Sequence, residues 1–410
     1  MASKAQPWYL AARPEHWRAL VAAQLGWMLD AMDVMLYAFA LTAIREEFGL
    51  SGAAAGGLAS VTLLASAAGG ASAGWLADRW GRTRVLMASI LIYSVFTGLT
   101  ATAGTVAELA LWRALVGLGL GAEWSAGSVL VAETWPAEHR GKAIGFMQAG
   151  WAVGYIFAAL LAAAILPRWG WRPLFAVGAL PALLVFWIRR AVPEPEIWKR
   201  QARHAPAFGQ ILRPPLLRLT ALATLLCSVL LFAYWGLFTW MPAYLASPVE
   251  QGGAGLGIVR STAWIVPMQL GAFLGYILFG VLADRWGRRP VFLLFVAGAG
   301  VLAPLYGAGN RSALLLAALG PLVGFFGHGY FSVFGALLAE LFPSRVRGTA
   351  QGLCYNAGRA VSALAPAAIG AIAGRLGIGG ALAATSAFFL AAGALMFTLP
   401  ETRGRQLEEA

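Results

Sequence analysis

The hexapeptide Asp78-Arg79-Trp80-Gly81-Arg82-Thr83 returns 206 residues later as Asp284-Arg285-Trp286-Gly287-Arg288-Arg289. In both copies a glycine, Gly74 or Gly280, precedes the aspartate by four residues, and a long apolar run precedes the loop. Self-similarity at a fixed offset indicates internal duplication. The two loops therefore divide the chain into two copies of one unit.

A second pair of segments supports the same division. Ala132-Glu133-Thr134-Trp135-Pro136 recurs at an offset of 207 as Ala339-Glu340-Leu341-Phe342-Pro343. An arginine and a glycine follow each segment, as Arg140-Gly141 and as Arg347-Gly348. Parallel duplication of a hydrophobic half is typical of membrane transporters.

Composition indicates a membrane protein. Apolar residues make up 60% of the 410 residues, charged residues only 12%, and the mean hydropathy is +0.70, all far from soluble domains. About 20 apolar residues are needed for one membrane span. The apolar runs cover 17–44, 51–77, 84–104, 107–132, 142–166, 173–188, 216–246, 258–282, 290–308, 312–341, 347–373 and 378–399. We therefore predict an all-α integral membrane protein of 12 transmembrane helices in two pseudo-symmetric six-helix bundles.

The basic residues predict the orientation. The first bundle is expected over 1–188, a linker over 189–215, and the second bundle with a short tail over 216–410. Of 30 Lys and Arg residues, 22 fall on the side of the termini and linker and six on the other. The positive-inside rule then places both termini and the linker in the cytoplasm, in a multi-pass protein of the inner membrane. Residues 1–18 are interpreted as a cytoplasmic lead-in because they lack a cleavable signal pattern.

Several function classes are disfavoured. The net charge of +12 is scattered over short loops and does not form a patch that would bind nucleic acid. Cys227 and Cys354 have no metal-type spacing. The glycine-rich runs lack a Walker lysine, and no nucleophile motif is visible. We expect no metal, no cofactor and no enzymatic activity, and we expect a monomer.

The repeated loops predict a conformational latch between the halves. Glycine permits a tight turn, and aspartate near a helix end can pair with arginine or accept bonds from a neighbouring helix N-terminus. The alternative is that these are topology charges with weak pairing. The predicted latch residues are Gly74, Asp78, Arg79, Gly81, Arg82, Glu133, Arg140, Gly280, Asp284, Arg285, Gly287, Arg288, Glu340 and Arg347.

Charges inside the predicted spans are costly unless they face a partner or water, so they are candidates for function. Asp30 and Asp33 share one helix face, which Tyr37 continues. Two close carboxylates resist being ionised together, so one of them could carry a proton. Alternatively, one aspartate pairs with Arg113 or caps a broken helix. Glu123 is either a substrate or proton contact or the partner of Arg113.

A candidate anion site lies in span eleven. Arg359 shares a helix face with Asn356 beside Tyr355, and a fixed guanidinium can hold a carboxylate through two hydrogen bonds. The alternative is a counter-ion for the acids of spans one and four. His328 could titrate or bind substrate, or simply pack between helices. Further candidates for a cavity lining are Gln148, Trp151, Tyr155, Trp235, Trp240, Gln269 and Tyr276.

The motifs resemble those of the major facilitator superfamily. Both Gly-x-x-x-Asp-Arg-x-Gly-Arg loops match its hallmark, Arg113-x-x-x-Gly117-x-Gly119 is similar to its proton-coupling segment, and 400–403 resembles the tail of its sugar-porter-like branches. The segments 121–124, 132–136, 192–198 and 351–356 resemble the branch of sialate and monocarboxylate proton symporters. Asp30-x-x-Asp33 is similar to that branch and to aromatic-acid symporters, with Ala31 where a glycine is more frequent. A basic residue in span eleven resembles the anion-type arrangement of related organic-ion transporters.

The resemblance implies a proton-coupled importer of a small organic anion that works by alternating access, with lactate or pyruvate as the first expectation. Its partners would be the anion, protons and the lipid bilayer. The alternatives are a sialic acid or aromatic-acid symporter, a transporter of sugars or cationic drugs, and, more distantly, a non-transporting nutrient sensor.

The buried charges are not duplicated. At offsets of 206 and 207, Asp30 corresponds to Gly236, Asp33 to Thr239, Glu123 to Tyr330 and Arg359 to Ala152. The duplicated loops would account for movement and the unrepeated residues for the cargo. We therefore expect a site between the two halves.

Overall fold

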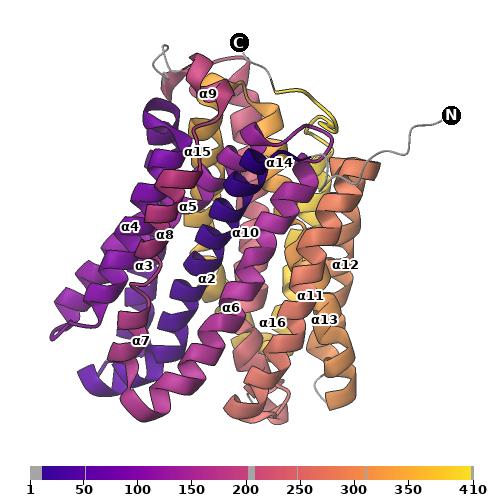
Figure 1. Cartoon of the computed structure of the whole chain (residues 1–410). Coiled ribbons are helices and arrows are strands. Elements are labelled where there is room, and N and C mark those ends of the chain that lie inside the picture. The colour runs from indigo at the N-terminus through magenta and orange to yellow at the C-terminus, as the bar shows by residue number, and fades with distance from the viewer. Residues whose placement is uncertain (1–11, 51, 202–207, 247, 310–311, 408–410) are drawn as a thin grey trace.

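The computed structural model describes residues 12–50, 52–201, 208–246, 248–309 and 312–407. Every regular element in these ranges is a helix, and ten of the helical segments are long and apolar enough to cross a membrane. With α3 and α15, the helices form the predicted twelve-helix architecture of two six-helix bundles (Figure 1). The predicted fold class is confirmed.

The first six units occupy the chain up to residue 191. They are α2 (Pro14–Phe48), α3 (Gly52–Trp80), α4 (Arg82–Thr100), α5 (Val106–Thr134), α6 (Arg140–Trp169) and the broken pair α7 (Trp171–Val177) and α8 (Ala182–Ala191). The expected linker contains the short α9 (Glu196–Gln201) and the 3-10 helix η1 (Phe208–Leu212). The chain thus turns from the first bundle to the second without a further domain between 191 and 216 in the described residues.

The second six units follow in the same order. They are α10 (Leu216–Ala246), α11 (Gly257–Trp286), α12 (Arg288–Ala308), the broken pair α13 (Ala313–Gly329) and α14 (Phe331–Leu341), α15 (Ser344–Ser362) and α16 (Ala365–Met396), with the 3-10 helix η2 (Val249–Gln251) between α10 and α11.

Three of the expected runs are not single helices, and one of them is 312–341, where α13 ends at Gly329 and α14 begins at Phe331. The run 347–373 does not form one helix, because α15 ends at Ser362 and α16 begins at Ala365. Pro366, in the first turn of α16, has no N–H and is therefore tolerated there but not inside a helix. The run 173–188 is interrupted between α7 and α8 for a similar reason, since Pro181 precedes α8 directly. Gly377, with φ of 72°, is not helical and divides α16 into two helices, which agrees with the expected boundary between the runs 347–373 and 378–399.

The two halves meet along two helix pairs, α3 with α15 and α6 with α11. Glycines allow the close approach: a methyl group on Gly74 would overlap the Gly348 carbonyl oxygen, and one on Gly280 would overlap that of Gly141. Small residues at helix crossings are the usual means of close packing in membranes. The glycine that precedes each repeated loop thus serves the contact between halves.

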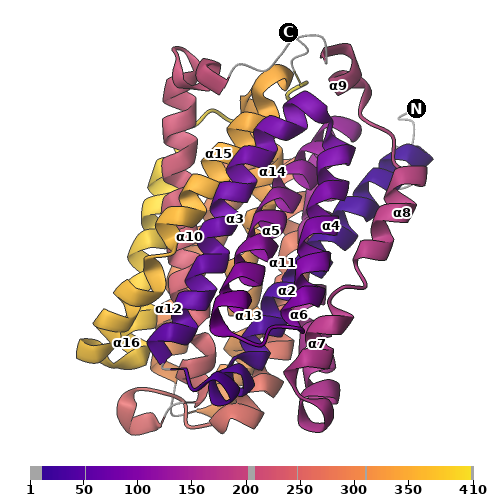
Figure 2. The ribbon, with the colours of Figure 1, turned by 90° about the vertical axis from the view of Figure 1, so that its left-hand side faces the viewer.

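One end of the bundle carries the linker, and we call it the linker end. Figures 1 and 2 show α9 at this end together with α14 and the last part of the chain. The start of α2 lies there too, because Trp135 Nε1 donates to the carbonyl of His16 at 2.9 Å. Both repeated loops turn at this same end.

Candidate functional site

Each repeated loop turns at its glycine. Gly81 has φ of 117° and Gly287 has φ of 108°, values that side chains with a Cβ rarely adopt. These turns end α3 and α11 and start α4 and α12 within a single residue. Backbone geometry therefore explains why the two copies of the motif share the same spacing.

The aspartate of each loop reaches across to the opposite half. Asp78 accepts hydrogen bonds from the backbone N–H groups of Gly348 at 3.0 Å and Thr349 at 2.7 Å. Asp284 accepts from those of Gly141 at 3.0 Å and Lys142 at 2.9 Å. A carboxylate on backbone N–H groups is a strong, charge-assisted contact.

The second pair of repeated segments adds a crossed ion-pair network. Glu133 pairs with Arg82 of its own half at 3.0 Å and with Arg347 of the other half at 2.6 Å. In the equivalent place, Glu340 pairs with Arg288 at 2.9 Å and with Arg140 at 3.0 Å. All of these side chains are nearly inaccessible to solvent. The structure thus brings the predicted latch residues together at the linker end.

Two of the proposed latch residues do not join this network. Arg79 and Arg285 are exposed, and neither forms an ion pair with the residues that the structure describes. Arg79 instead lies over the ring of Trp75 at 5.4 Å. Adjacent helical residues are about 100° apart, so a side chain next to a buried aspartate faces outward.

Sequence reasoning missed two glutamates that complete the loops. Glu194 accepts from the backbone N–H groups of Arg82 at 2.7 Å, Thr83 at 3.1 Å and Arg84 at 3.1 Å at the start of α4. Glu401 accepts from those of Arg288 and Arg289, both at 2.9 Å, at the start of α12. Carboxylates are favourable at helix N-termini. The signal was present, because Pro193-Glu194 recurs as Pro400-Glu401 at the offset of 207.

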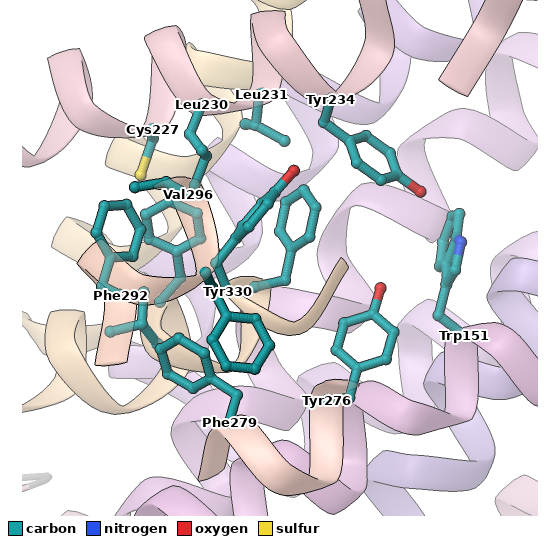
Figure 3. Close-up of a cluster of buried hydrophobic side chains, with 14 of the residues drawn as sticks. Trp151, Cys227, Leu230, Leu231, Tyr234, Tyr276, Phe279, Phe292, Val296 and Tyr330 are labelled. Atoms are coloured by element: carbon teal, nitrogen blue, oxygen red, sulfur yellow. The ribbon is translucent and has the colours of Figure 1, made fainter. Parts of the chain in front are cut away.

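A small cavity of about 20 Å³ lies between the two halves. Seven of its ten lining residues are aromatic, and the lining comes from α2, α6, α10, α11, α14 and α15. The lining consists of Trp27, Gln148, Trp151, Leu231, Tyr234, Trp235, Tyr276, Phe331, Tyr355 and Arg359. Figure 3 shows the hydroxyl groups of Tyr234 and Tyr276 pointing toward the space beside Trp151.

Arg359 is the charged residue of this lining. It is 5% exposed, and its Nη1 donates to Ser66 Oγ at 2.6 Å. Its Nε has no hydrogen-bond partner, and no carboxylate lies within 4.0 Å of its nitrogens, in the part of the chain that the structure describes. A buried guanidinium with free donor capacity beside a cavity can receive an anion.

The polar and aromatic candidates divide into lining and non-lining residues. Tyr355 lines the cavity and stacks on Trp124 with ring centroids 3.7 Å apart. Gln148 also lines it and accepts from Trp124 Nε1 at 3.0 Å. Asn356 lies outside the lining because it is turned toward α5, where it donates to Ser125 Oγ at 3.3 Å.

Four further candidates also lie outside the lining. The ring centroid of His328 lies 4.2 Å from that of Phe238, and its Nδ1 lies 3.1 Å from the Gly324 carbonyl oxygen. Tyr37 places its ring 4.8 Å from the Arg113 guanidinium. Tyr155 lies 6.1 Å from the ring of Phe39, and Gln269 is buried in α11. Sequence reasoning missed Trp27, although it lies three residues before Asp30 on the same face of α2.

The buried acids have different surroundings. Asp33 pairs with Arg113 at 3.4 Å and accepts a hydrogen bond from the Thr97 hydroxyl. By contrast, both oxygens of Asp30 and both of Glu123 are inaccessible and lack hydrogen-bond partners among the described residues. Glu123 contacts Gly26, one helical turn before Asp30 on α2. Arg113 is thus the partner of Asp33 and not of Glu123.

Comparison with known proteins identifies the family of this architecture. The sequence model of the Major Facilitator Superfamily matches residues 25–268 and 254–410. Among solved structures, the proton:xylose symporter XylE superposes with a TM-score of 0.79 at 19% identity, over 96% of this chain and 98% of that one, which supports the fold alone.

Curated relatives of similar length are organic-compound transporters by description. The chain is 35% identical to a "probable 4-methylmuconolactone transporter" of Cupriavidus pinatubonensis, over 98% of this chain and 94% of the relative. It is 37% identical to the cis,cis-muconate transport protein of Acinetobacter baylyi, over 88% and 89%. It is 32% identical to the sialic acid transporter NanX of Escherichia coli, over 92% of each chain.

Proposed function

The chain belongs to the major facilitator superfamily of transporters, and we propose that it imports a planar organic anion together with a proton by alternating access. The observation that carries this proposal is Arg359, a buried guanidinium without a carboxylate partner among the described residues, in the wall of a cavity between the two halves. Arg359 would hold the substrate carboxylate, with Tyr355 and Gln148 beside it.

The aromatic walls favour a conjugated or ring-shaped acid. Flat aromatic side chains offer stacking surface to a planar ligand. Lactate and pyruvate, the first expectation from sequence, present little surface to seven aromatic residues. Two of the relatives are named for muconate-type compounds and one for sialic acid, which also favours acids larger than lactate.

The proton would be carried by Asp30 and Glu123. An ionised carboxylate that is buried without a partner is costly. In the conformation with the linker end closed, both carboxyl groups would therefore be protonated and neutral. Opening would bring water to these groups and allow release of a proton. Asp33 would act as the permanent partner of Arg113.

The latch would set the balance between the conformations. The linker end would be cytoplasmic, and the contacts of Asp78, Asp284, Glu133 and Glu340 would hold it closed until substrate and proton are both bound. The halves 1–188 and 216–410 would move about the linker 189–215 in a monomer of the inner membrane.

The proposal is tested in proteoliposomes with the purified protein. Labelled cis,cis-muconate, benzoate, sialate, lactate, a sugar and a cationic drug are offered with and without an inward proton gradient. We expect a planar acid to accumulate only with the gradient and a protonophore to abolish accumulation. Gradient-driven uptake of a sugar or cationic drug alone would refute the anion assignment, and binding of an acid without uptake would indicate a sensor.

A further inference from the structure

One face of α3 contacts one face of α15 from the linker end to the cavity, and we call this contact the α3–α15 seam. On α3 the seam residues recur every fourth position: Ser66, Gly70, Gly74 and Asp78. On α15 the facing residues are Gly348, Gly352, Asn356 and Arg359. Positions four apart on a helix share a face, so the seam is a continuous row of contacts.

The two ends of the seam are polar and its middle is closely packed. At the linker end, Asp78 binds the backbone of Gly348. In the middle, a methyl group on Gly74 would overlap the Gly348 carbonyl. At the cavity end, Arg359 donates to Ser66. One rigid contact therefore connects the latch with the candidate anion site.

The duplication shows which part of the seam is scaffold. In the equivalent contact of α11 with α6, Asp284 and Gly280 repeat Asp78 and Gly74. Ser66, however, corresponds to Ala272 at the offset of 206, and Arg359 corresponds to Ala152 at 207. In the second copy of the contact, alanine therefore stands in place of both Ser66 and Arg359. A pair that is polar in only one of two equivalent contacts is not required to hold the helices together.

Ser66 is held firmly in place. A methyl group on Gly121 of α5 would overlap the Ser66 carbonyl oxygen, and one on Gly117 would overlap that of Thr62, so α3 and α5 lie in direct backbone contact. Ser66 is 3% exposed. Its hydroxyl therefore offers Arg359 an acceptor at a fixed position in the first half of the chain.

Arg359 has a competing partner in the same region. The guanidinium of Arg359 is near enough to Asp30 for their charges to attract each other. A direct ion pair with Asp30 would occupy the guanidinium and remove its attraction for a substrate anion. The hydrogen bond to Ser66 instead occupies one Nη atom and leaves Nε without a partner in the described residues.

We propose that Ser66 is a positioning residue of the carboxylate site: it orients Arg359 toward the cavity and keeps it from pairing with Asp30. This inference rests on the proposed function, because it assumes that Arg359 binds the substrate carboxylate. Since the Ser66–Arg359 bond joins the two halves, a carboxylate that draws Arg359 away also loosens the cavity end of the seam. Substrate binding would thereby act directly on the contact that carries the latch.

The test compares Ser66→Ala with Ser66→Thr, which retains a hydroxyl, and with Ser72→Ala as the matched control. Ser72 lies on the same helix, and among the described residues its hydroxyl donates only to the backbone carbonyls of Ala68 and Gly69. The dissociation constant for cis,cis-muconate and for benzoate is measured on the purified protein by quenching of tryptophan fluorescence, and thermal stability is measured without ligand. Adding Asp30→Asn to Ser66→Ala tests the competition.

We expect Ser66→Ala to weaken binding about tenfold, which corresponds to the loss of one orienting hydrogen bond. Ser66→Thr and Ser72→Ala should bind as the wild type does, and Asp30→Asn should restore part of the affinity lost in Ser66→Ala. A merely structural role for Ser66 would lower the thermal stability and leave the dissociation constant unchanged, and that result would overturn the inference. If the wild type binds no acid, the proposed function fails instead.

Discussion

Arg347 of the second half donates a hydrogen bond from Nη1 to Oε1 of Glu133 in the first half, over 2.6 Å. Its pseudo-symmetric counterpart is the bond from Arg140 to Glu340 at 3.0 Å. Both cross between the halves at the linker end, and both are buried. Removing one partner from a buried pair leaves the other charge uncompensated, at a cost of about 3–5 kcal/mol. These two bonds therefore favour the state in which the linker end is closed.

Glu133→Gln should shift the population toward an open linker end, because Gln removes the charge that holds Arg82 and Arg347 together. Spin labels at the exposed positions Arg84 and Arg345, in a background without Cys227 and Cys354, would report a longer distance in the variant. Glu108→Gln is the matched control, since the Glu108 carboxylate accepts from the N–H of Gly104 and, in the part of the chain that the structure describes, bonds only within the first half. An unchanged distance distribution in Glu133→Gln would refute the latch.

Glu194→Gln and Glu401→Gln should each lower the thermal stability. The two glutamates accept backbone bonds at the starts of α4 and α12, where a carboxylate contributes about 0.3–1 kcal/mol. Because the two glutamates bind different backbone groups, one in each half, their effects should add in the double variant. Glu196→Gln, at an exposed residue of α9 that pairs with Lys199, is the control and should change little. If only one of the two glutamates stabilised its helix, only one of the two variants would melt at a lower temperature than the wild type.

The contribution of Glu401 should depend on pH. Burial raises the pKa of this carboxyl, but hydrogen bonds from the backbone of Arg289, Arg288, Arg403 and Thr402 outweigh it and hold the pKa below the usual 4.5. A group with a lowered folded-state pKa stabilises the protein above its unfolded pKa and loses this effect as the pH falls. The difference in melting temperature between wild type and Glu401→Gln should therefore be constant from pH 7 to pH 6 and shrink progressively as the pH falls below 4.5. A difference in melting temperature that increases as the pH falls would contradict a stabilising role of the ionised Glu401 carboxylate.

The sequence predicted what is periodic or duplicated. Hydropathy predicted the twelve spans, and the repeated loops led to Asp78 and Asp284, which the structure places on backbone N–H groups of the opposite half. The breaks at Pro181 and Pro366 could not be placed, because long apolar runs continue across both prolines. Helix continuity there depends on packing that a hydropathy pattern does not contain.

The candidate site was predicted only in part. Unpaired charges in a span are conspicuous, so Arg359, Asp30 and Glu123 could be named from the sequence. Asn356 and His328 lie outside the cavity lining, because helix faces can be identified from the sequence without knowing which neighbouring helix each face meets. Ser66 is an ordinary serine in a small-residue helix and becomes informative only through its contact with Arg359.

Arg359→Ala should abolish binding of cis,cis-muconate, and Arg359→Lys should weaken it about tenfold, because lysine keeps the charge but loses the planar pair of donors. Isothermal titration or fluorescence quenching on the purified variants provides the measurement. Arg375→Ala, at an exposed arginine of α16, is the control and should bind normally. Wild-type affinity in Arg359→Ala would assign Arg359 to structure and remove the main support for an anion substrate.

Asp30→Asn and Glu123→Gln should separate substrate exchange from proton-driven accumulation. Both carboxyls lack hydrogen-bond partners in the described residues, so a neutral amide of the same shape reproduces the protonated acid and should fold normally. Substrate exchange across proteoliposomes without a gradient should persist, whereas accumulation driven by an inward proton gradient should be lost in at least one variant. Asp33→Asn is the contrasting change, because it leaves Arg113 buried with a weaker partner and should chiefly reduce stability. Full gradient-driven accumulation in both Asp30→Asn and Glu123→Gln, and in their double variant, would show that the proton is carried elsewhere.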